Sequence, residues 1–502
     1  MPQSLRLHWI DLAIIVLYLA MVVGSGFYFG GRQQSTARYF LGGREVPWWA
    51  IAASIVATET STVTFISVPG IAYASGGDFR FLQIVFGYLV ARVVISVFFM
   101  PKYFRRELVT VYELLQDRFG TAVKALAATL FIVMRTVADG VRLLLTGFVL
   151  AAVLQTLNIG AEKAVSGSII GIGLVMIIFT LYGGIEAIVW VEVVQLGIYL
   201  LGALAAAVVL VRDIPGGFST AVSLGEQYHK FRVLDFSFDI TKTFTFWSGV
   251  IGGAFLTMST HGTDQYMVQR YLCTDRPRKA AQALLLSGVI VLAQFIGFLF
   301  IGVLLFAFNR PDRLPVYARP GSAAPFTAAD QVFPDFITHH LPVGLSGLVV
   351  AAIFAAAMSS SLNSIAATVV ADLYKPLKPN RDDRHYLKVS QIVTVIAGIV
   401  QIVVGVAMER TAKSALNTVL SIASLINGPI LGVFLLGWSR RGGRTAAFAG
   451  MLTGIIVVSY VAFATEVAWP WYTLIGSMTT FIAGRLVAAF EKKREFRISN
   501  EE

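Results

Sequence analysis

Long apolar stretches recur along almost the whole chain, and they limit it to a membrane protein of many helices. A stretch of roughly 20 mainly apolar residues is long enough to cross a bilayer as a helix. We identify about thirteen such stretches, near 9–30, 47–75, 82–101, 124–156, 164–182, 187–211, 247–263, 281–308, 344–373, 389–408, 415–438, 446–464 and 471–490. Only 14% of the 502 residues are charged, which excludes a soluble globular protein. The sequence therefore predicts an all-α integral membrane protein.

Basic residues in the loops predict how the chain is oriented. Lys and Arg are more frequent in the loops that follow odd-numbered spans, and basic loops remain in the cytoplasm. We therefore expect a multi-pass protein of the inner (plasma) membrane with its N-terminus outside and its C-terminus in the cytoplasm. The net charge of +11 is spread over separate short loops, so we predict no nucleic-acid partner.

The loops are too short to hold a second folded domain. The longest, 212–246 and 309–343, are both expected outside, so residues 1–502 are interpreted as a single transmembrane domain for which a monomer can suffice. The first span is longer than the core of a signal peptide and is expected to be retained. Because no enzyme motif stands in a suitable context, we predict that the chain is not an enzyme.

The second span is interrupted by polar residues near its middle. Ala57–Thr64 contains six polar side chains, and Pro69 follows them. Polar side chains can bond to the backbone and compete with helix hydrogen bonds, so we expect local unwinding here. Unwound backbone at this depth is tolerated where it lines a cavity or binds a ligand.

A run of three serines, Ser359–Ser361, interrupts the apolar stretch 344–373. One interpretation is helix packing, because small residues let backbones approach closely. The other is cation binding: a bend that frees the carbonyl of Ala356 would bring it together with the Ser359 and Ser360 hydroxyls. Carbonyls of Ala57 and Thr60 from the second span would complete a cage of about five neutral oxygens, which suits a monovalent cation because hard cations prefer oxygen ligands.

Charged residues occur within several spans, where each is costly unless it is paired. Arg135, Asp139 and Arg142 share one helix face, and together with Glu59 their charges cancel, so a closed ion-pair network is one reading. In the other, Arg135 binds a substrate carboxylate with its planar guanidinium, and Glu59 either competes for that arginine or carries a coupled proton. For Glu192, a salt bridge and ion binding are both open. Arg92 and Arg485 receive no interpretation.

Five segments in order resemble the sodium/solute symporter family, and the closest pattern is that of its bacterial sialic acid branch. They span nearly the whole chain: Phe40–Arg44 before Trp48 and Trp49, Ala57–Phe65, Gly183–Glu186 with Trp190 and Gln195, Asp264 with Val268–Tyr271, and Ala351–Ser364.

This resemblance implies a LeuT-like core of two inverted five-helix repeats. The repeats would occupy 47–211 and 247–438, with one extra helix at 9–30 and two C-terminal helices in 446–490. The resemblance also implies the five-residue sodium site given above and substrate contacts by Ser61, Thr64 and Arg135.

Three departures from the branch pattern concern the solute and a second sodium ion. Gly87 stands where the branch carries a glutamine, and Glu192 stands where the family usually has aspartate. The serine run is three residues closer to Leu362 than is usual in the branch. A second sodium site formed by Glu192, Ser361 and Ser364 is therefore an alternative to a single sodium.

The sequence as a whole favours a sodium-coupled secondary active symporter. It would import a small polar organic solute, a carboxylate being one option, by alternating access. Its partners would be the solute, Na+ and the lipid membrane. The alternatives are a proton-coupled symporter, a transporter-like sensor that does not transport, and a passive channel.

Overall fold

The computed structural model describes residues 8–31, 33–60, 62–155, 161–309, 329, 332–358, 361–409, 412–439 and 442–501, and these form helices with no strand among them. Eight of the helices in the described ranges are long and apolar enough to cross a membrane. The prediction of an all-α membrane protein is therefore confirmed.

The N-terminal half of the chain forms ten helices in the part that the structure describes. They are α1 (Trp9–Gly30), α2 (Thr36–Leu41), α3 (Trp48–Glu59), α4 (Thr62–Tyr73), α5 (Leu82–Val94), α6 (Met100–Tyr103), α7 (Glu113–Phe119), α8 (Thr121–Gln155), α9 (Ala161–Asp213) and α10 (Gly217–Gln227). Helix α1 packs on α9 and α15, outside the central helices. The expected second span is thus divided into α3 and α4.

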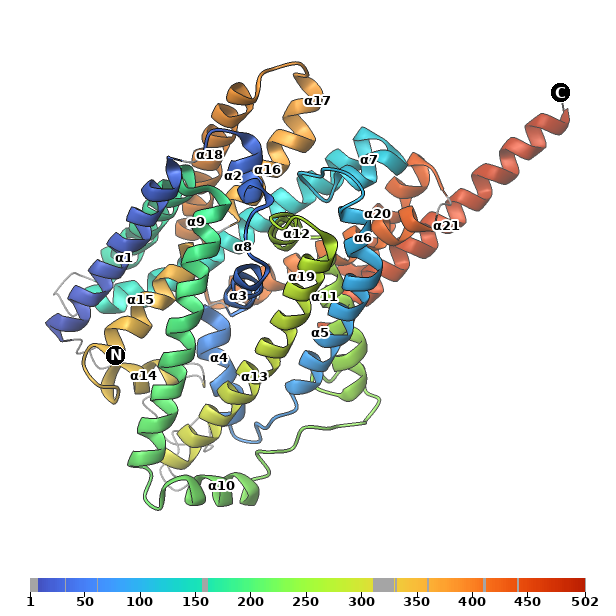
Figure 1. Cartoon of the computed structure of the whole chain (residues 1–502). Helices are drawn as coiled ribbons and strands as arrows, with labels where there is room; N and C mark the ends of the chain where they lie inside the picture. The colour runs from blue at the N-terminus through green and yellow to red at the C-terminus, as the bar shows by residue number, and fades with distance from the viewer. Residues whose placement is uncertain are drawn as a thin grey trace.

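The C-terminal half contains α11 (Gly253–Gly262), α12 (Gln265–Leu272), α13 (Pro277–Asn309), α14 (Val332–His339), α15 (Leu345–Met358), α16 (Leu362–Thr368), α17 (Lys375–Leu377), α18 (Asp383–Glu409), α19 (Ala412–Trp438), α20 (Arg444–Ala464) and α21 (Pro470–Glu501). Helices α20 and α21 pack on each other and on α19. Helices α3 and α12 lie at the centre of the bundle, and α10 lies at the end opposite α7 and α17 (Figure 1).

One expectation about helix boundaries needs correction. The spans expected at 164–182 and 187–211 correspond to the two helical parts of α9, which are separated by a kink at Gly184, where the backbone is non-helical (φ 58°, ψ −163°). The segment after 263, expected to be a cytoplasmic loop, instead forms the wholly buried helix α12 and ends at the buried Cys273. Helix α12 was missed because Gln265, Gln269 and Arg270 make it too polar to read as a span. The count of thirteen spans stays a prediction.

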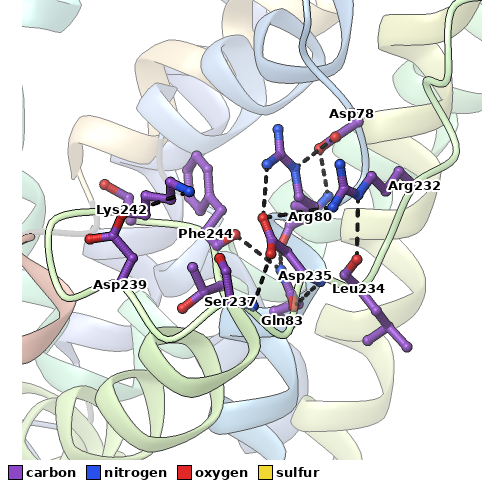
Figure 2. A network of polar contacts seen from close by, with 12 residues as sticks. Asp78, Arg80, Gln83, Arg232, Leu234, Asp235, Ser237, Asp239, Lys242 and Phe244 are labelled. Atoms are coloured by element: carbon purple, nitrogen blue, oxygen red, sulfur yellow. Dashed lines mark hydrogen bonds and ion pairs between the residues drawn. The ribbon is translucent and has the colours of Figure 1, made fainter.

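The segment 228–246, which precedes α11, is fastened to the loop between α4 and α5. Figure 2 shows Arg80 between Asp78 and Asp235, with Nε–Oδ2 and Nη1–Oδ2 distances of 2.7 and 3.2 Å. The side chain of Gln83 donates to the Phe244 carbonyl at 3.2 Å and accepts from the Asp235 amide at 2.9 Å. The segment is therefore held at both its middle and its end.

Hydrogen bonds and charge keep Asp235 ionised in this network. The largest influences are hydrogen bonds from Ser237, and together with Arg80 and Arg232 they hold the pKa of Asp235 below its usual value. Close by, the buried ammonium of Lys230 donates to the carbonyls of residues 72–74 at 2.6 to 3.3 Å, satisfying the C-terminus of α4. The segment 228–246 and α4 are thus one connected unit.

Candidate functional site

Two helices are interrupted at the places where the sodium residues were predicted. Helix α3 ends at Glu59, Thr60 has non-helical backbone angles (φ −80°, ψ 67°), and α4 begins at Thr62. Helix α15 is described as far as Met358 and α16 from Leu362, and Ser361, directly before α16, has non-helical backbone angles (φ −77°, ψ 6°). Such interruptions leave carbonyl groups without helix partners, and those groups can face a cation.

The predicted sodium residues lie at these two interruptions. Ala57 is buried in the last turn of α3, and Ala356 lies in the last turn of α15. Ser359 and Ser360 lie outside the described residues, as does the predicted substrate residue Ser61. The set of sodium ligands therefore stays a prediction. The helices that carry these ligands are interrupted at the expected positions.

The two threonines that were predicted as ligands use their hydroxyls within the protein. The buried Thr60 donates its hydroxyl to Gln294 Oε1 on α13 at 2.7 Å, so its carbonyl is the group left for a cation. Thr64 donates its hydroxyl to the Glu59 carbonyl at 3.1 Å, which spans the break between α3 and α4. The first bond fixes the break to α13, and the second fixes the start of α4 to the end of α3.

Glu59 at the end of α3 binds the residue that the sequence left without an interpretation. Arg92 on α5 forms an ion pair with its carboxylate, and the Arg92 side chain is only 1% exposed. His261, in the last turn of α11, lies 3.2 Å from the same carboxylate (Nε2 to Oε1). Arg92 also donates to the hydroxyl of Ser287 on α13 at 3.3 Å. Residues of α3, α5, α11 and α13 therefore meet around the pair of Glu59 and Arg92.

Arg135 on α8 is paired with Asp264, which lies between α11 and α12. Its guanidinium carbon also lies 4.6 Å from the ring centroid of Tyr266, and Arg270 lies at the same distance from that ring. Cations over an aromatic face are stabilised by the ring quadrupole. The residue predicted to bind a carboxylate thus holds a carboxylate of the protein itself.

Asp139 joins α8 to the serine-containing interruption. Its carboxylate accepts from the amide of Ser361 at 2.8 Å and from its hydroxyl at 2.6 Å. Arg142, three residues further along α8, lies 3.6 Å from the other carboxylate oxygen. The predicted closed network among Glu59, Arg135, Asp139 and Arg142 is therefore present only for this last pair, because Glu59 and Arg135 pair with other residues.

Glu192 on α9 lies at the centre of a second polar cluster. Arg270 of α12 donates to its carboxylate at 2.5 Å, and Thr58 of α3 donates to it at 3.0 Å. Of the other two residues predicted for a second sodium, Ser361 binds Asp139, and Ser364 donates to Gln269 at 2.6 Å. The second sodium site stays a prediction. In the structure, its three residues Glu192, Ser361 and Ser364 bind different protein groups.

The partners of these charges were not predicted from the sequence. Arg92, His261, Asp264, Tyr266 and Arg270 were not assigned to the site. The available signal was the presence of charge inside apolar or buried segments, which is costly unless it is paired. Within the described ranges, no group of three His, Cys, Asp or Glu residues could hold a metal ion.

Known proteins match the chain over almost its whole length. The sequence model of the sodium:solute symporter family matches residues 39–454. The sodium/sialic acid symporter NanT of Aliivibrio fischeri is 31% identical over 95% of this chain and 92% of its own length. The sodium/sialic acid symporter SiaT of Proteus mirabilis is 30% identical, over 96% of each chain.

A solved structure shares the fold. The substrate-bound, outward-open state of a Na+-coupled sialic acid symporter superposes with a TM-score of 0.85 at 29% identity, and covers 96% of this chain and 98% of that chain. The arrangement of broken helices described above is therefore similar to that of a sodium-coupled transporter.

Proposed function

This chain belongs to the sodium:solute symporter family, and we propose that the small organic solute which it moves with sodium is a carboxylate such as sialic acid. The motif resemblance is thereby confirmed, and with it the LeuT-like fold, sodium-coupled symport and Na+ as the coupling ion. The proposal concerns what is finer than the family: the solute, the sodium ligands and the direction of transport.

The observation that carries the proposal is the paired interruption of α3/α4 and α15/α16. Carbonyls of Ala57, Thr60 and Ala356, with the hydroxyls of Ser359 and Ser360, supply five neutral oxygens, which suit a monovalent hard cation. A sodium ion there joins α3 to α15 and favours the conformation that accepts solute from outside. Its release into the cytoplasm loosens the junction and lets the solute follow.

The solute lies next to the break in α3/α4 in our proposal. Ser61, Thr64 and Glu59 contact its polar groups, and Arg135 binds its carboxylate with two parallel hydrogen bonds. Support comes from Arg135 itself, which already pairs with a carboxylate in the structure. The two relatives named above are both sodium/sialic acid symporters, so sialic acid is the first solute to test.

The membrane arrangement follows the loop charges. We propose that the chain lies in the inner (plasma) membrane with its N-terminus outside and its C-terminus in the cytoplasm, acts as a monomer and has no enzymatic activity. Residues 47–211 and 247–438 form the two repeats, 9–30 the extra helix, and 446–490 the C-terminal pair, within one transmembrane domain.

Removal of the two serine hydroxyls tests the sodium site. In Ser359→Ala combined with Ser360→Ala, two of about five ligands are lost, so the sodium concentration that gives half-maximal uptake should rise at least about tenfold. The control is Ser390→Ala, which removes a buried hydroxyl that donates to the Tyr386 carbonyl on α18, away from the two helix interruptions. Sodium dependence unchanged in the double variant would remove this site assignment.

A further inference from the structure

Asp264 has two separate functions in the structure, one for each carboxylate oxygen. Oδ1 accepts from the Tyr266 amide at 2.9 Å and so caps the N-terminus of α12. Oδ2 is the partner of the Arg135 guanidinium. The side chain of Asp264 is 2% exposed, so water and salt weaken this ion pair much less than an ion pair at the surface.

Arg135 keeps unused capacity for hydrogen bonds although it is paired. Its Nε is buried and has no hydrogen-bond partner among the described residues. Its side chain is 13% exposed, in contrast to the 2% of Asp264, so Arg135 is the more accessible member of the pair. A guanidinium offers five N–H donors and binds a carboxylate best through two of them at once.

The other charges around this pair already have partners. Arg142 lies 3.6 Å from Asp139, and Arg270, which is also 4.6 Å from the Tyr266 ring centroid, binds Glu192 at 2.5 Å. His261, on the helix that precedes Asp264, contacts Glu59 at 3.2 Å. Among these cations, Arg135 is therefore the one whose ion-pair partner lies in a non-helical turn and whose Nε has no hydrogen-bond partner among the described residues.

We propose that Asp264 is an internal competitor that occupies Arg135 until the carboxylate of the solute displaces it. The inference rests on the proposed function, in which Arg135 binds that carboxylate. Displacement breaks only the bond of Oδ2, while Oδ1 continues to cap α12. Asp264 thus acts through Arg135 as a positioning residue and sets the affinity for acidic solutes.

The exchange also connects solute binding to the junction of α11 and α12. Asp264 follows Thr263, the C-cap residue of α11, and precedes the first residue of α12. Solute binding therefore releases the junction of α11 and α12 from α8. Only a solute with a negatively charged group can cause this release, which gives the protein a physical basis for discriminating acids from neutral sugars.

Asp264→Asn tests the competition, because asparagine also caps a helix but carries no charge. We would measure sodium-dependent uptake of sialic acid and of its uncharged methyl ester in proteoliposomes. If Asp264 occupies Arg135 about nine-tenths of the time, its neutralisation lowers KM for the acid about tenfold. KM for the ester should stay the same, and Vmax for the acid should change less than KM.

The matched control is Asp275→Asn, a few residues further along the chain. Asp275 is 40% exposed and pairs with Arg276 and Lys279 at 3.1 and 2.9 Å, so its neutralisation removes one charge without touching Arg135. KM for both compounds should equal that of the wild type. If Asp264→Asn does not yield folded protein, Asp264→Ser replaces it, since serine is also an N-cap residue.

Each outcome decides between competition and a fixed structural pair. An unchanged or raised KM for the acid, or an equal change for acid and ester, would overturn the competition. If the wild type neither transports nor binds the acid but Asp264→Asn binds it, the competition holds and the proposed solute is wrong. If neither protein binds it, both ideas fall.

Discussion

Glu59 and Arg92 show how single charged side chains are accommodated inside this membrane protein. Their side chains are 12% and 1% exposed, and they join the end of α3 to α5. Removing one member of a buried pair leaves an unpaired charge, which typically costs about 3 to 5 kcal/mol, whereas replacing both members is often neutral. The pair therefore contributes to stability mainly by cancelling the two charges.

Arg92→Met should accordingly lower the free energy of unfolding by at least about 3 kcal/mol. The double variant Glu59→Gln with Arg92→Met should regain most of that loss, because no isolated charge remains. Unfolding in detergent by heat or denaturant measures both. Arg106→Met is the control, since Arg106 pairs with Asp117 at the surface with the side chains 67% and 42% exposed, and should change little. A double variant as unstable as the single one would contradict this account.

The sequence identified the charged residues Glu59 and Arg135 of the site, but it did not identify the residues with which they pair. Glu59 and Arg135 stood out because they lie within apolar spans. Their partners are 33 and 129 residues away, and a spacing rule along one helix cannot find them. Asp139 and Arg142, three apart on one helix, are the pair that spacing did identify.

Gly184 determines the shape of the longest helix, α9. Its combination of φ and ψ is one that only glycine adopts without strain. A Cβ at this position would also lie 2.9 Å from the Tyr39 carbonyl oxygen and 3.2 Å from the Gln33 side chain. The bend sets the direction of the part of α9 that carries Glu192, so it matters for the site as well as for the fold.

Gly184→Ala should therefore reduce the stability of the protein by about 2 kcal/mol or more. Gly197→Ala, in the same helix, is the matched control because a Cβ there meets nothing within 4 Å and the backbone is helical. It should leave stability unchanged or slightly increased, since alanine is the better helix former. The thermal midpoints of the two variants give the comparison, and equal midpoints would show that the bend is not constrained.

Elements were predicted well where they are apolar and poorly where they are polar. The break between α3 and α4 was anticipated from the polar run Ala57–Thr64, and the non-helical Ser361 before α16 from the serines. The kink of α9 at Gly184 lies between the spans expected at 164–182 and 187–211. Helix α12 was missed because it is buried among protein side chains, so hydropathy does not reveal it.

The whole molecule combines a central set of broken helices with outer elements fastened to them. The outer segment 228–246 is tied to the α4–α5 loop by Arg80 and Asp235, so movement of α4 must carry this segment along (Figure 2). The sequence predicted the order of the spans, but which helices meet at the centre depends on contacts between distant segments. That arrangement followed from the family resemblance and not from hydropathy.

Uptake into proteoliposomes under an imposed ion gradient tests sodium-coupled symport of a carboxylate most directly. The wild-type protein should accumulate sialic acid above its external concentration when sodium is higher outside, and accumulation should end when the sodium gradient is removed. A proton gradient alone should drive none. Accumulation that follows the proton gradient, equilibration without accumulation, or binding without any uptake would contradict the account.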